Sequence, residues 1–135
     1  MTSRDLEALI DTIEIRQRAV FRWGSNDCVR FAARAVRAQT GRNPLADVPR
    51  WRSRREAMAI TDEMGGLIAA LDARFDRVAP AFAKRGDIAG IEDRLFGVRL
   101  MIVEGATLVG PGNRGLERLP REAMTMAWSA VGASD

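Results

Sequence analysis

The one cysteine of this sequence, Cys28, is its most obvious candidate for chemistry. A thiol becomes a useful nucleophile when a helix N-terminus, a nearby cation or a general base lowers its pKa. The sequence contains no histidine, so the usual base for a cysteine nucleophile is missing. The other common role of a lone cysteine is that of a buried, inert apolar residue. The surroundings of Cys28 therefore decide between a reactive and a structural thiol.

The residues after Cys28 predict a helix that begins at the thiol. Apolar residues recur at helical spacing over residues 29–39, and Ser25, Asn26 and Asp27 are candidate caps just before them. Cys28 would then lie in the first turn, where the helix dipole favours a thiolate, although the charge of Asp27 opposes it. Asp27 is expected to be a cap or hydrogen-bond anchor rather than a catalytic acid.

The residues Phe21-Arg22-Trp23-Gly24-Ser25-Asn26-Asp27-Cys28 resemble the motif F-x-W-G-x-x-D-C of a phage- and prophage-borne branch of the NlpC-type cell-wall peptidases. Shorter matches follow in the order of that branch: Phe31-Ala32-Ala33, Thr40-Gly41, Gly86-Asp87, Gly115-Leu116, Pro120 and Ala127-Trp128. The resemblance implies an α+β, papain-like fold of the NlpC type, in which N-terminal helices precede a small antiparallel sheet.

The motif residues also have structural interpretations. We expect Phe21 to lie in the core and Trp23 to bury a large area beside the helix start. Gly24 is expected to allow a tight approach or a positive φ angle.

Active NlpC-type enzymes carry a histidine on the strand that follows Gly-Asp, and this sequence departs from them there. Counting back from Gly105 puts Arg99 at that position, with Phe96 as the alternative. Arginine stays protonated and cannot act as a general base, although its charge could hold Cys28 as a thiolate. A carboxylate base (Asp87, Glu92 or Glu104) or a histidine from a partner chain would be needed for hydrolysis.

The periodicity changes from helix to strand along the chain. We expect helices over residues 6–13, capped by Thr2 or Ser3, and over 29–39, 53–60 and 64–71, with the second ending at Gly41. Short strands are expected over residues 88–91, 98–103, 107–109 and 116–119 as an antiparallel meander, and residues 127–131 close the sheet or form a short helix. Helices followed by strands indicate one α+β domain over residues 1–135, helical to about 72 and sheet from about 75 to 131.

Composition excludes several classes of protein. With one cysteine and no histidine there is no internal disulfide and no zinc cluster, so we expect no cofactor and no metal. No apolar run reaches the roughly 20 residues needed to cross a bilayer, and we find no secretion signal at the N-terminus. Residues 110–115 fit G-x-G-x-x-G, but the helix that a dinucleotide site requires does not follow, so a glycine-rich hairpin turn is expected.

The cationic residues are almost all arginines, and the net charge is +3. The densest group of arginines is at residues 50–55, around Trp51. An aromatic ring among arginines could bind nucleic acid through base stacking and phosphate contacts. The preferred interpretation is a solvated loop and helix start with Trp51 packed inward, so a nucleic-acid partner is not expected.

These observations favour a phage or prophage tail protein with a degenerate NlpC-type fold that acts structurally at the tail tip or in tail assembly. Its partners would be other tail proteins or a cell-wall peptide, homo-oligomers around the tail axis are compatible with this role, and the protein would be made in the host cytoplasm and reside in the virion tail. The alternative is a cysteine hydrolase or acyltransferase that acts on cell-wall peptides through Cys28.

Overall fold

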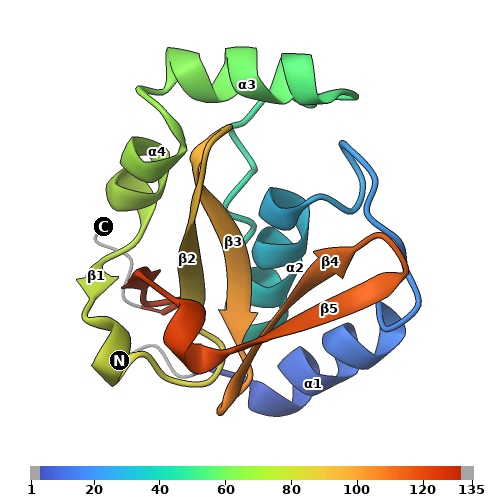
Figure 1. Ribbon diagram of the computed structural model, residues 1–135, viewed down its shortest axis with the longest axis vertical. Coiled ribbons are helices and arrows are strands. Elements are labelled where there is room, and N and C mark those ends of the chain that lie inside the picture. The colour runs from blue at the N-terminus through green and yellow to red at the C-terminus, as the bar shows by residue number, and fades with distance from the viewer. Residues whose placement is uncertain (1–3, 132–135) are drawn as a thin grey trace.

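The computed structural model describes residues 4–131, in which four α-helices precede a β-sheet (Figure 1). The helices are α1 (Leu6–Ile15), α2 (Cys28–Thr40), α3 (Arg54–Glu63) and α4 (Leu67–Arg74). The predicted α+β class and the four helices are confirmed. Helices α1 and α2 extend beyond their expected bounds, and α3 and α4 both begin and end later than expected, α4 by three residues at each end. None of the helices in the described residues is long and apolar enough to span a membrane.

Within residues 4–131, six strands form one antiparallel sheet. They are β1 (Arg77–Val78), β2 (Ile88–Asp93), β3 (Gly97–Val103), β4 (Thr107–Gly112), β5 (Gly115–Pro120) and β6 (Met126–Trp128). The order across the sheet is β1-β6-β2-β3-β4-β5, so the expected meander runs from β2 to β5. The last segment joins the sheet between β1 and β2 rather than forming a helix.

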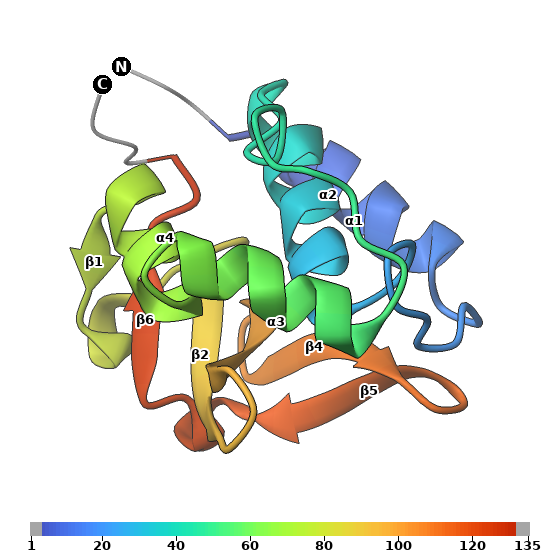
Figure 2. The same ribbon diagram turned by 90° about the horizontal axis from the view of Figure 1, so that it is seen from above.

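The two faces of the sheet are covered differently. Helices α2 and α4 pack on one face and α1 packs on α2, as Figure 2 shows from above. Because successive strand residues point to opposite faces, Ile102 faces this helical layer while Met101 and Val103 face the other side. There they pack with residues beside two short 3₁₀ helices, η1 (Pro80–Phe82) and η2 (Arg121–Ala123). The central strands β3 and β4 are therefore largely buried on both sides, whereas the edge strand β5 is mostly exposed.

Side chains and glycines set the helix ends. Asp5 caps α1 by accepting a hydrogen bond from the backbone N–H of Ala8, so the predicted caps, Thr2 and Ser3, are wrong and lie outside the described residues. Helix α2 ends as predicted at Gly41, which has a φ angle of 78°. The two-residue strand β1 was not predicted, because two residues carry no periodicity.

Asp87, in the predicted Gly-Asp pair, joins distant parts of the chain. Its side chain is almost fully buried and accepts hydrogen bonds from the backbone N–H groups of Lys84 (2.8 Å) and Ala130 (3.1 Å). It also pairs with the guanidinium of Arg4 at 3.0 Å. Gly86 beside it has a φ angle of 94°, and a Cβ there would overlap the side chain of Gln39. Asp87 therefore joins residues near the two ends of the described chain, Arg4 and Ala130.

We predict that Asp87→Asn lowers the free energy of unfolding by about 2–4 kcal/mol, because one acceptor oxygen becomes a donor and a buried charge pair is broken. Asp47→Asn is the matched control, since the Asp47 side chain is 77% exposed and pairs with Arg74 at 3.4 Å. It should change stability by about 0.5 kcal/mol or less. Equal denaturation midpoints for the two variants in urea would contradict the anchoring role of Asp87.

Candidate functional site

Cys28 and Arg99 line the same pocket. The pocket has a volume of about 320 Å³ and lies between the start of α2, the β2–β3 turn and the β4–β5 hairpin. Its walls are formed by Phe21, Trp23, Cys28, Asp93, Leu95, Phe96, Val98, Arg99, Pro111, Gly112, Asn113 and Glu117. Phe96, the alternative to Arg99, is thus also on the wall.

Asp27 fixes the position of Cys28 at the helix start. As the N-cap of α2, its buried carboxylate accepts a hydrogen bond from the backbone N–H of Arg30 at 2.9 Å. Its second oxygen accepts from the backbone N–H of Gly24 at 2.8 Å and from the indole N–H of Trp51 at 2.7 Å. The expected anchor role is therefore confirmed, and the partner Trp51 was not foreseen.

Gly24 permits the close approach that brings these groups together. It has a φ angle of 84°, and a Cβ at this position would overlap the backbone carbonyl oxygen of Trp51. Both expected roles of this glycine, the positive φ and the tight approach, are therefore observed.

The β4–β5 hairpin holds the segment that precedes α2. The backbone N–H of Phe21 donates to the carbonyl of Gly112 at 2.8 Å, and that of Leu116 donates to the carbonyl of Gln17 at 3.1 Å. A Cβ on Gly115 would approach the Gln17 oxygen to 2.7 Å, so the hairpin needs glycine there. The glycine-rich segment is a hairpin turn, as predicted, and it forms one pocket wall.

Three aromatic rings form the apolar part of the wall. Phe21 meets Trp23 edge to face, with ring centroids 5.0 Å apart, and Trp23 lies 5.9 Å from Phe96. Phe21 and Trp23 are partly exposed. The expectation that Phe21 lies in the core is therefore wrong, because the hairpin contact leaves its ring at the pocket edge.

The charged groups of the pocket are already paired. Arg99 forms an ion pair with Glu117 at 3.3 Å, and Asp93 accepts hydrogen bonds from the backbone N–H groups of Leu95 and Phe96. Asp93 and Glu117 were not singled out in the sequence. Asp93 lies between the strands expected over residues 88–91 and 98–103, and this position next to the strand that carries Arg99 could have pointed to it.

The three carboxylates considered as bases, Asp87, Glu92 and Glu104, do not line this pocket. The side chain of Asp87 is bound to Arg4, Lys84 and Ala130, and Glu104 pairs with Arg118 at 2.9 Å. The described residues contain no group of three or more carboxylate or cysteine ligands that could hold a metal.

The pocket environment holds Cys28 as a neutral thiol. The pKa of Cys28 is raised from 9.0 to about 11, mainly because the thiol is buried, and the charges of Asp27 and Asp93 contribute to the rise. A backbone hydrogen bond with Leu100 and the charge of Arg99 lower it, but by less. A thiolate, which the helix terminus alone would favour, is therefore disfavoured, because desolvation of the charged form outweighs the helix terminus.

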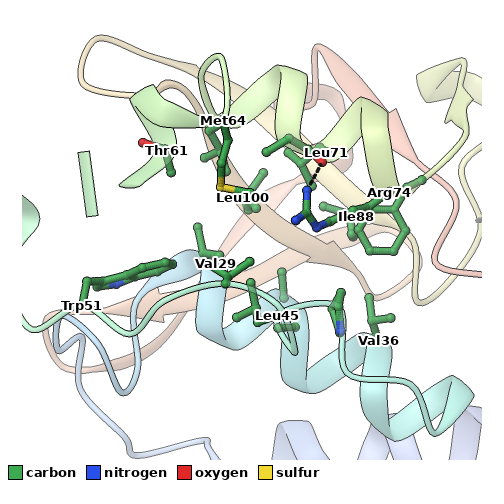
Figure 3. Close-up of a pocket in the computed structure, with 17 residues that line it drawn as sticks. Val29, Val36, Leu45, Trp51, Thr61, Met64, Leu71, Arg74, Ile88 and Leu100 are labelled. Atoms are coloured by element: carbon green, nitrogen blue, oxygen red, sulfur yellow. Dashed lines mark hydrogen bonds between the residues drawn. The ribbon is translucent and has the colours of Figure 1, made fainter. Parts of the chain in front are cut away.

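A second, apolar cavity of about 50 Å³ lies between α2, the segment before α3 and helix α4 (Figure 3). Val29, Val36 and Leu45 approach it from one side, and Met64, Leu71 and Leu100 from the other. Its lining includes no carboxylate and no thiol.

Trp51 is 3% exposed and borders this apolar cavity. The preferred interpretation, with Trp51 packed inward, is confirmed. Stacking of its ring on a nucleic-acid base, the other interpretation, is therefore wrong.

The sequence from residue 3 to residue 130 matches a family model described as a domain of unknown function, DUF6950. The chain belongs to the DUF6950 family. No curated protein matches it. The pocket and the Asp27 anchor both lie within the DUF6950 match.

We predict that Gly24→Ala lowers stability by more than about 2 kcal/mol, because it combines a positive φ angle with steric overlap. Gly41→Ala is the control, since Gly41 has a φ angle of 78° but no other group lies within 4 Å of the place that its Cβ would take. It should cost about 1 kcal/mol from backbone strain alone. Similar losses of unfolding free energy for both variants in chemical denaturation would contradict a steric overlap at Gly24.

We also predict that iodoacetamide labels Cys28 about 100-fold more slowly in the folded protein than in urea at pH 8, because the pKa is about 11 instead of 9.0. Arg99→Gln should slow labelling further and Asp93→Asn should speed it. Since the folded-state pKa is the higher one, stability should fall as pH rises from about 9 to 11. Equal rates for folded and unfolded protein would contradict this environment.

Proposed function

We propose that the protein is a binding module of the papain-like, NlpC type that has lost its chemistry and serves as a structural component of a phage or prophage tail. The observation that carries this proposal is the shared pocket of Cys28 and Arg99, in a chain without histidine. An NlpC-type peptidase has its nucleophile at a helix start and its base on a facing strand. In this proposal Arg99 takes the place of that base, and a protonated guanidinium cannot accept the proton.

The state of Cys28 supports binding over cleavage. With a pKa of about 11, roughly one molecule in ten thousand carries a thiolate at pH 7. The carboxylates Asp93 and Glu117 are occupied by backbone N–H groups and by Arg99. The site therefore offers a shaped cavity without a prepared nucleophile.

The walls of the pocket suit a peptide segment. Phe21, Trp23 and Phe96 provide apolar contact, while the exposed amide of Asn113 and the Arg99–Glu117 pair offer polar partners at the rim. A volume of about 320 Å³ accommodates one or two side chains of a peptide. The partner would be a segment of a neighbouring tail protein or a cell-wall peptide.

The competing function is a cysteine hydrolase or acyltransferase. It is favoured by the place of Cys28 on the pocket wall at the start of α2 and by the charge of Arg99, which lowers the thiol pKa. It would require a base from another chain.

Binding can be tested by following Trp fluorescence as soluble peptidoglycan peptides are added to the protein. We expect Trp23→Ala to weaken binding by about tenfold or more, Cys28→Ala to leave the affinity unchanged, and mass spectrometry to recover the peptides intact. Ile15→Ala, an exposed apolar residue on α1, is the control for nonspecific loss. Cleavage by the unchanged protein that disappears in Cys28→Ala would establish the enzyme instead.

The tail role has its own test. In a phage or prophage that encodes the protein, purified particles should contain it in stoichiometric amounts, and Cys28→Ala particles should assemble and infect normally. Particles that assemble but fail to infect would show that Cys28 has a chemical role.

A further inference from the structure

The residues that line the Cys28 pocket carry more negative than positive charge. They include two carboxylates, Asp93 and Glu117, and one guanidinium, that of Arg99. Arg99 and Glu117 pair with each other at 3.3 Å, whereas Asp93 forms no ion pair within residues 4–131. Three exposed arginines lie next to pocket residues in the sequence but do not line the pocket: Arg22, Arg94 and Arg114. Because water and salt screen charges at exposed positions, the pocket wall keeps one negative charge without a cation.

The carboxylate of Asp93 has one oxygen to offer a ligand. Its hydrogen bonds from the backbone N–H groups of Leu95 (3.0 Å) and Phe96 (3.1 Å) both go to Oδ2. Within residues 4–131, Oδ1 accepts no hydrogen bond, and it is accessible to solvent. Asp93 is therefore held by the β2–β3 turn and keeps an open, charged acceptor.

The thiol of Cys28 shows which sign of charge is felt inside the pocket. After burial, which raises the pKa of Cys28 most, the charge of Asp27 raises it by more than the charge of Arg99 lowers it. The charge of Asp93 raises this pKa further. The nearby charges therefore make the potential at the thiol negative, and a negative potential attracts a cation.

The aromatic part of the wall suits an aliphatic chain that ends in a cation. The ring planes of Phe21 and Trp23 are inclined by 84°, and those of Trp23 and Phe96 by 41°. Rings inclined in this way form a curved apolar surface, against which a narrow alkyl chain can pack. The face of an aromatic ring also attracts a cation within about 6 Å of its centroid.

We propose that the pocket binds a lysine side chain, with the aliphatic stem against the aromatic rings and the ammonium group on Oδ1 of Asp93. The lysine belongs to the peptide partner of the proposed function, on which this assignment rests. Arginine fits less well, because its bidentate pairing needs two free carboxylate oxygens and Oδ2 of Asp93 is already used. A glutamate side chain would meet a charge of its own sign.

The test is an NMR titration of the protein with blocked tripeptides, acetyl-Ala-X-Ala-amide, in which X is lysine, norleucine, arginine or glutamate. The blocked ends leave the side chain as the only source of an ammonium group. Norleucine has the four-carbon stem of lysine without its charge. The lysine peptide should bind about tenfold more tightly than the norleucine peptide, because it adds a charge-assisted hydrogen bond.

Asp93→Asn tests the acceptor directly. Asparagine keeps an oxygen for the N–H groups of the turn but removes the charge. The lysine and norleucine peptides should then bind equally. Asp62→Asn removes the same charge from an exposed position on α3 and should leave the preference for lysine unchanged. The comparison of peptides on the unaltered protein decides the question if Asp93→Asn does not fold.

The outcomes separate this site from the proposed function. Equal binding of the lysine and norleucine peptides to the unaltered protein, or tighter binding of the arginine or glutamate peptide, would overturn the lysine site and leave peptide binding intact. A preference for lysine that survives in Asp93→Asn, or that is lost equally in Asp62→Asn, would overturn the role of Asp93. If neither these four peptides nor peptidoglycan peptides bind, the lysine site and the proposed peptide binding are both wrong.

Discussion

The buried carboxylate of Asp27 is the constraint on which the site depends. It receives backbone N–H groups from both sides of the α2 start and the indole N–H of a residue 24 positions later in the chain. One side chain thereby fixes the helix start, the turn at Gly24 and the segment that leads to α3. Because the carboxylate has two oxygens and three donors converge on it, neither a hydroxyl nor an amide could replace it without leaving a donor unpaired.

The Asp27 carboxylate positions two different groups, the thiol of Cys28 and the indole of Trp51. On one side it sets Cys28 on the wall of the aromatic pocket, and on the other it fixes Trp51 beneath the guanidinium of Arg30. The negative charge next to the thiol raises its pKa, together with the larger effect of burial. An arrangement that organises a helix start thus works against a thiolate at that position. In an active cysteine enzyme a neighbouring cationic base offsets this effect, and in this chain Arg99 offsets it only in part.

Periodicity and turn chemistry predicted much of the fold. The spacing of Leu9 and Ile13, the glycine at the end of α2 and the glycine-rich hairpin after β4 were sufficient for the helices and the meander. Asp27 was one of three cap candidates before α2, and Arg99 was singled out by counting back from Gly105 on the family resemblance. The bond between Asp27 and Trp51 could not be predicted, because it joins residues whose distance depends on how the loop before α3 folds back. Phe21 was misplaced for a related reason, since a hairpin almost a hundred residues later holds it at the pocket edge.

The hairpin contact has a consequence for how the protein is made. A ribosome releases the N-terminal segment first, yet the carbonyl of Gly112 that binds Phe21 emerges 91 residues later. Until then Phe21 lacks this backbone hydrogen bond, although Asp27 can already bind Gly24 and Trp51. Such contacts of long sequence separation slow folding, because the chain must close a large loop before they form. The pocket is therefore a late product of synthesis, assembled only when most of the sheet exists.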